Sequence, residues 1–82
     1  MRIHYATEGP AKITVEIYDF AMEPVRTVVS GKERAGEGEW DEVWDGKSER
    51  GDVVANGVYF YKITREIRGS KIAVWGKIIV LD

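Results

Sequence analysis

The 82-residue sequence predicts an all-β fold, an antiparallel sandwich of about seven strands. Apolar and polar residues alternate along most of the chain, which is the pattern of half-buried strands. Nine glycines interrupt this alternation and mark turns. No window places apolar residues at positions i, i+3, i+4 and i+7 over three helical turns, so no helix is expected.

Two strands are expected first. Residues 2–6 form one of them, with Ile3 and Tyr5 on the same face. Residues 12–18 form the clearest strand of the chain, because its odd-numbered residues are apolar and most of its even-numbered residues are polar. Such a strand buries one face and exposes the other.

A hairpin and a loop are expected next. Residues 19–23 turn the chain, and residues 24–29 run back beside the preceding strand. Residues 30–38 hold three glycines and several charges, so they are predicted to be a loop.

The next strand covers residues 39–45 and places Trp40 and Trp44 on one side. Residues 46–56 form a long polar connection. It is expected to touch the sheet at residues 53–54, which would supply the seventh strand.

The chain closes with a hairpin. Residues 57–66 are rich in β-branched and aromatic side chains, residues 68–70 make the turn, and residues 71–81 form the final strand. Gly76 lies inside that strand, which suggests a bulge or a close backbone approach.

Charge and composition exclude several functions. The net charge is −2 and the basic residues are interleaved with acids, so nucleic acid is not an expected partner. The chain has no cysteine, which excludes thiol chemistry, and no cofactor is expected. No apolar run is long enough to cross a membrane, and no signal peptide opens the chain. The chain is therefore expected to be either cytoplasmic or a fragment of a larger precursor, and we favour a single domain, residues 1–82, that is a fragment of a larger protein.

One constellation of residues resembles a known family. Trp44-Asp45-Gly46 is followed by Arg50-Gly51 and then by the run Val54-Ala55-Asn56-Gly57-Val58-Tyr59-Phe60-Tyr61, with related segments upstream at residues 15–19 and 25–28. In this order and spacing the chain resembles the immunoglobulin-like domain of the flagellar hook-capping protein. Similar domains end many bacterial secreted and surface proteins, and some of them are sorting domains for type IX secretion. The resemblance implies an immunoglobulin-like sandwich.

The signature residues have structural interpretations. Trp44 suits the end of a core, Asp45 can accept backbone N–H groups, and Tyr59 can fix a neighbouring loop through its hydroxyl. The glycines suit turns that need a positive φ or begin a strand. The full expected set is Trp44, Asp45, Gly46, Gly51, Gly57 and Tyr59.

Three positions depart from the family pattern. Met22 stands where the family usually has glycine, at a cost of about 1 kcal/mol if the backbone there is left-handed. Glu42 stands where the family tends to be apolar, so its carboxylate is expected to be exposed or paired. The chain ends in Leu81-Asp82, whereas sorting domains tend to end in a basic residue.

Candidate chemistry is sparse, and no enzyme is expected. His4 is the sole histidine and is expected on the surface, and the serines fall in turns without a nucleophile motif. The acids between residues 37 and 45 could hold calcium, but a solvated acidic strand is the favoured interpretation, and no metal is expected. Trp40 and Trp75 are either core residues or members of a binding patch.

We expect a non-catalytic structural or assembly module of a larger bacterial surface, secreted or flagellar-type protein, placed outside the cytoplasm. Its partners would be other domains of its own protein or an assembly or secretion partner. A C-terminal sorting domain and a carbohydrate-binding module are the alternatives. Strands at the edges of its sheets could also pair between copies to form a dimer.

Overall fold

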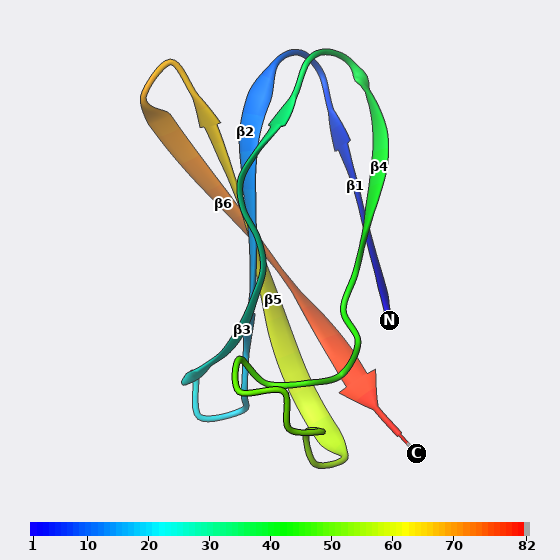
Figure 1. Cartoon of the computed structure of the whole chain (residues 1–82). Coiled ribbons are helices and arrows are strands. Elements are labelled where there is room, and N and C mark those ends of the chain that lie inside the picture. The colour runs from blue at the N-terminus through cyan, green and yellow to red at the C-terminus, as the bar shows by residue number, and fades with distance from the viewer. Residues whose placement is uncertain (82) are drawn as a thin grey trace.

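The computed structural model describes residues 1–81 and consists of β-strands joined by turns and loops (Figure 1). The sandwich predicted from the sequence is confirmed, with six strands in place of about seven. Val53 makes only an isolated bridge with Lys47, because the loop that carries it turns again at once. The strands are β1 (Arg2–Thr7), β2 (Ala11–Tyr18), β3 (Pro24–Arg34), β4 (Gly38–Val43), β5 (Gly57–Ile67) and β6 (Ser70–Val80).

The strands form two antiparallel sheets of unequal size. The larger sheet has the order β3-β2-β5-β6, and the smaller one pairs β1 with β4. The small sheet covers one face of the large sheet over β2, and β4 approaches β3 (Figure 1). The β5–β6 hairpin extends past this cover on the opposite side. We call the covered side of the large sheet its inner face and the other side its outer face.

The core lies between the two sheets. Ile13, Val15 and Ile17 of β2 point into it and are fully buried, as their alternation predicts. Each such side chain contributes about 1.5–3 kcal/mol by leaving water. The remaining buried apolar residues are Ile3, Tyr5, Ala11, Trp44, Tyr59, Ile63 and Val80.

The prediction of a loop at residues 30–38 was wrong for its first half. β3 continues to Arg34, because Lys32, Glu33 and Arg34 pair with the beginning of β2. Irregularities in the register absorb Gly31, which has φ 63°. Pairing with a neighbouring strand therefore overrides a local composition that is typical of loops.

The β5–β6 hairpin closes with a two-residue turn. Arg68 and Gly69 both have positive φ, at 52° and 82°, as a type I′ turn requires. Of the two interpretations of Gly76, the bulge was wrong, because the register of this hairpin is continuous. The structure shows a close approach to its backbone, since the ring of Tyr61 lies over Gly76 so closely that a Cβ at this position would collide with it.

Candidate interaction surface

The signature tryptophan closes one end of the core. Trp44 directly follows β4 and its side chain is almost completely buried. Its indole N–H donates to the carbonyl of Lys47 at 2.9 Å, and its ring meets the edge of Tyr59 at a centroid distance of 5.6 Å. The Tyr59 hydroxyl in turn donates to the carbonyl of Ala55 at 2.7 Å. Together these contacts fix both ends of the connection from β4 to β5.

The other signature residues shape that connection. The Asp45 carboxylate accepts the N–H of Lys47 at 3.0 Å, and Gly46 and Gly51 have φ of 76° and 88°. Gly57 has φ 151° and begins β5. These backbone angles strain residues that carry a Cβ, so glycine is the suitable residue there.

The same connection fastens onto the outer edge of β3. Glu49 donates its N–H to the carbonyl of Val25 at 2.9 Å and accepts the N–H of Thr27 through its carboxylate at 2.8 Å. Arg26 donates to the carbonyl of Ser48 at 3.1 Å. The first part of this edge, at Val25–Thr27, is therefore closed by the chain itself, which is how proteins protect edge strands from pairing.

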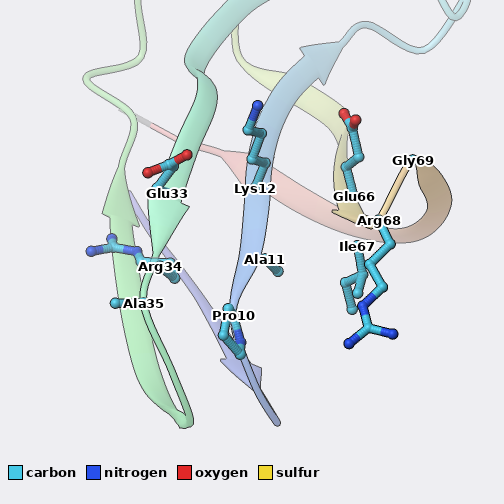
Figure 2. Close-up of a pocket in the computed structure, with 10 residues that line it drawn as sticks. All are labelled: Pro10, Ala11, Lys12, Glu33, Arg34, Ala35, Glu66, Ile67, Arg68 and Gly69. Atoms are coloured by element: carbon cyan, nitrogen blue, oxygen red, sulfur yellow. The ribbon is translucent and has the colours of Figure 1, made fainter.

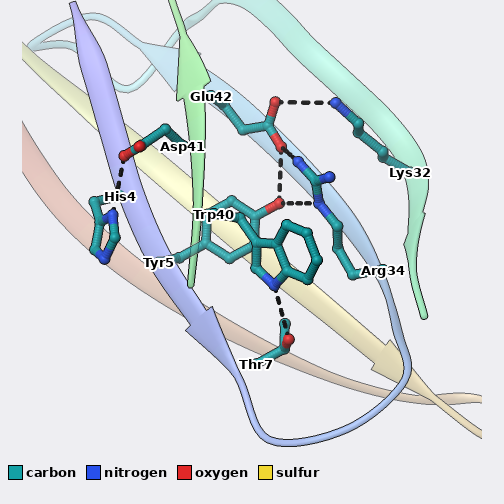
Figure 3. Close-up of polar contacts among 8 residues, drawn as sticks. All are labelled: His4, Tyr5, Thr7, Lys32, Arg34, Trp40, Asp41 and Glu42. Atoms are coloured by element: carbon teal, nitrogen blue, oxygen red, sulfur yellow. Dashed lines mark hydrogen bonds and ion pairs between the residues drawn. The ribbon is translucent and has the colours of Figure 1, made fainter. Parts of the chain in front are cut away.

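A buried carboxylate joins the two sheets (Figure 3). Glu42 of β4 is 5% exposed and accepts hydrogen bonds from Arg34 and Tyr5, both at 2.7 Å. Arg34 also donates to the Tyr5 hydroxyl at 3.0 Å, and the Lys32 ammonium lies 3.5 Å from the second carboxylate oxygen. The expectation that Glu42 is exposed or paired is met by pairing.

Two cations, Arg34 and Lys32, compensate the buried Glu42 carboxylate. Burial by itself raises the pKa of Glu42, but hydrogen bonds from Tyr5 and Arg34 and the positive charge of Lys32 lower it further than burial raises it. Burial is the main cause that raises the pKa of Tyr5. Glu42 therefore stays ionised and Tyr5 stays neutral near pH 7, which keeps the acceptor and the donor of their hydrogen bond in place.

Trp40 belongs to the same cluster. Its indole N–H donates to the Thr7 hydroxyl at 2.9 Å, and the Arg34 guanidinium lies over its ring at 4.3 Å (Figure 3). Thr7 donates onward to the carbonyl of Gly36 at 2.7 Å. Because its ring face is covered by Arg34 and its N–H is hydrogen-bonded to Thr7, Trp40 contributes to packing and is not part of an open surface.

His4 lies on the exposed side of the small sheet. Its two ring nitrogens lie 2.9 Å from Asp41 and 2.9 Å from Glu39. The hydrogen bond with Asp41, then that with Glu39, raises the pKa of His4 above its ordinary 6.5. Within residues 1–81 no cluster of three or more ligating side chains is arranged to hold a metal ion.

A hollow of about 720 Å³ opens where the ends of β2, β3 and β5 meet (Figure 2). Lys12 lies there between Glu33 and Glu66, which are its cross-strand partners on either side. Such opposite charges stabilise a sheet. The polar lining of the hollow thus includes oppositely charged residues on neighbouring strands.

The outer face of the large sheet carries a second cluster, which is aromatic. Tyr18 of β2 and Trp75 of β6 pack with centroids 5.3 Å apart, and Phe20 stacks on Phe60 at 6.2 Å. Phe20 is 75% exposed and Trp75 is 46% exposed, and Ile79 continues the apolar surface along β6. We call Tyr18, Phe20, Phe60, Trp75 and Ile79 the outer patch.

Polar groups surround the outer patch. Lys62 lies over the Trp75 ring at 5.5 Å, and Lys77 is the cross-strand partner of Phe60. The far half of the same face is polar and forms a small hollow of about 230 Å³. Of this patch, sequence reasoning singled out Trp75 alone. The alternation of β2 and β5, continued across the register of the sheet, is the signal that places Tyr18 and Phe60 beside it.

Comparisons with known proteins agree with the fold described above and with the resemblance found in the sequence. The model of the FlgD Ig-like domain family matches residues 1–69, which takes in β1 to β5 and ends just before β6. The solved structure of FlgD from P. aeruginosa matches with a TM-score of 0.73 and 20% sequence identity. That match covers 95% of this chain and 59% of the P. aeruginosa chain, so it concerns the fold of part of that protein. Among curated proteins there is no match.

The predicted resemblance to the flagellar hook-capping type is thereby confirmed. Because the family model covers most of the chain and the solved structure shares its fold, this chain belongs to the family of FlgD Ig-like domains.

Proposed function

We propose that this chain is a non-catalytic assembly module of a larger, extracytoplasmic bacterial protein of the flagellar hook-capping type. Its task is to hold another protein component in place, and the outer patch is the surface on which that component docks. Membership in the FlgD Ig-like domain family supports the assembly role. Within residues 1–81 no helix has the length and apolarity needed to cross a bilayer.

The observation that carries the docking proposal is the exposure of Trp75 on the sheet and of Phe20 in the turn that follows β2. Apolar side chains of this size are normally buried, and a contiguous exposed set of them marks an interaction site. Aromatic residues are enriched in protein interfaces because they bury a large area with few rotatable bonds. Strand pairing holds Phe60 and Trp75 in the sheet, so little order is lost on binding.

The lysines around the patch give the partner a charge preference. Two lysines, Lys62 and Lys77, lie at the edge of the aromatic surface, and Glu16, the cross-strand partner of Lys62, lies beside Tyr18, so these three groups together carry a positive charge. We therefore expect the partner to place apolar groups on the patch and carboxylates around them, with faster association at low salt.

Exposed Trp75 also favours a second function, carbohydrate binding, because sugars stack on aromatic rings. The two functions differ in what the whole patch must do. A sugar platform depends chiefly on Trp75, whereas a protein interface also depends on Phe20, which stacks on Phe60 at the other side of the patch.

The test is made in the bacterium that carries the gene. Phe20→Ser and Trp75→Ser are introduced together into the chromosomal copy, and hooks are counted by electron microscopy. We expect hooks to be lost, while the purified variant chain melts within a few degrees of the unaltered one, because both side chains are exposed. The matched control is Thr14→Ser with Thr64→Ser, on the polar half of the same face, and this variant should assemble hooks normally.

Three results would overturn the proposal. Normal hooks in the patch variant would exclude the outer patch as the docking surface. Binding of the purified chain to glycans, lost in Trp75→Ser alone, would replace assembly by carbohydrate binding. Export of a reporter fused to the chain, blocked by the patch variant, would make it a sorting domain.

A further inference from the structure

The two edges of the large sheet differ. The beginning of the β3 edge is closed by Glu49, which binds both the Val25 carbonyl and the Thr27 N–H. β6 forms the other edge and pairs with β5 alone. Within residues 1–81 no backbone or side-chain hydrogen bond closes its free side. β6 is eleven residues long, so it presents an extended row of free N–H and C=O groups.

β6 also has the composition of a covered strand. Its inner face carries Ile72 and Val74, and its outer face carries Trp75 and Ile79, all of them exposed. Strands that are apolar on both faces normally lie in the middle of a sheet with layers on each side. An open, regular and apolar edge is suited to the addition of a further strand.

We infer that a second copy of this chain adds its β6 to the β6 of the first, antiparallel about a two-fold axis through Trp75. This inference goes beyond the proposed function, since it names a self-association that a docking surface does not require. The two large sheets would join into one continuous sheet, and the two outer patches would become a single surface across the axis.

The sequence of β6 selects this register. An axis at Trp75 pairs all eleven residues, Ser70 with Val80 at the ends, and places Ile72 against the partner's Ile78 on the inner face. On the outer face Ala73 lies opposite the partner's Lys77, so no two lysines are opposed. An axis one residue earlier would oppose Lys71 to the partner's Lys77, and like charges directly across a ladder destabilise it.

The chain is suited to a cross-linking test because it has no cysteine of its own. Ala73→Cys and Lys77→Cys are prepared as separate variants. In the proposed register each introduced cysteine lies four residues from its own copy in the partner, about 13 Å along the strand, which is too far for a disulfide. Ala73→Cys in one copy and Lys77→Cys in the other lie directly opposite, within disulfide reach.

We therefore expect mild oxidation to cross-link the equimolar mixture and neither variant alone. Sedimentation of the unaltered chain from about 1 µM to about 500 µM should show a monomer converting to a dimer. Ala73→Glu places an acid opposite the partner's Lys77 twice, and should tighten the dimer roughly 2- to 30-fold. Ala73→Lys, the matched variant, should weaken it by a similar factor.

A chain that stays monomeric over this range overturns the inference. So does a dimer in which the mixture fails to cross-link, or in which Ala73→Glu and Ala73→Lys have equal effects, because either result places the contact elsewhere. The outcome is independent of the proposed function. Trp75 belongs to both surfaces, but sedimentation and cross-linking use chains that keep Trp75, so loss of hooks in the patch variant together with a monomeric unaltered chain would remove the dimer and leave the docking surface standing.

Discussion

β2 and β6 belong to the same sheet and present apolar residues to the same face, yet β2 is covered along this face, whereas β6 is open over its first half and covered only toward Val80. Val15, Ile63 and Val74 form a single row of cross-strand partners on the inner face. Val15 is 0% exposed, Ile63 is 6% exposed and Val74 is 53% exposed. The cover ends within one row, because the small sheet has only two strands and lies over β2.

This difference separates two properties that are often both inferred from an alternating pattern: the face that a side chain occupies and the burial of that face. Alternation decides which face of a strand a side chain occupies, because successive residues point to opposite sides. Whether that face is buried depends on how far the opposing sheet extends. Val15 and Val74 therefore have the same position in the pattern but contribute differently to the free energy of unfolding.

The largest expected effect tests this row directly. Val15→Ala should destabilise the chain by about 2–3 kcal/mol, because it removes buried methyl groups and leaves a cavity. Val74→Ala, the same substitution in the same row, should cost less than about 0.5 kcal/mol. Urea unfolding at low protein concentration measures both, and equal losses would mean that the β5–β6 hairpin is covered as well as β2.

Arg34→Met is a second test of the covered part of the molecule, because it removes the main cation that pairs with buried Glu42. The substitution leaves Glu42 buried with Lys32 as its remaining cation, so we expect a loss of about 2 kcal/mol, less than for a charge left wholly unpaired. Arg26→Met is the control, because Arg26 lies 3.8 Å from a half-exposed Asp45 and such pairs contribute under about 1 kcal/mol. Adding Glu42→Leu to Arg34→Met should recover much of the loss, whereas a further loss would contradict a cost due to an unpaired charge.

The third prediction concerns backbone strain in two turns. Because this strain is local, its relief should have the same effect in the covered part of the sheet around β2 and in the open β5–β6 hairpin. Met22 in the β2–β3 turn has φ 66°, and Arg68 in the β5–β6 turn has φ 52°. Met22→Gly and Arg68→Gly should each stabilise the chain by about 0.5–1 kcal/mol, since relief of strain outweighs the entropy of the added glycine. Calorimetric melting measures both, and a gain confined to the covered half would show that packing controls these turns.

The smallest expected effect lies on the exposed side of the small sheet. The pKa of His4 is raised in the folded chain, so protonated His4 stabilises the fold fully below pH 6.5. That contribution is lost as the pH rises through the folded pKa. The melting temperature should therefore fall slightly from pH 6 to pH 8 in the unaltered chain and stay level in His4→Gln. A parallel fall in both proteins would assign the pH dependence to another group.

Local signals were sufficient for much of the fold. The alternation of β2, the hairpin turn before β6 and the run from Trp44 to Tyr59 were all readable, because each depends on neighbours in the chain. The extension of β3 to Arg34 was not, since its reason is pairing with β2. Trp75 could be named as a candidate from the sequence. Ile79 joined it only through the register of the sheet, and Phe20 only through its stacking on Phe60.

The sequence by itself determined an all-β chain, the faces of its strands and the residues of its turns, because periodicity and turn chemistry are local properties. The hook-capping Ig-like type came from the resemblance of its motif to a known family. The tertiary structure decided that Glu42 is buried with Arg34 and Tyr5, that Trp40 is engaged while Trp75 is exposed, and that one sheet edge is closed at its beginning and the other is free. These features depend on distances between strands that are far apart in the chain, and such distances are set when the two sheets pack.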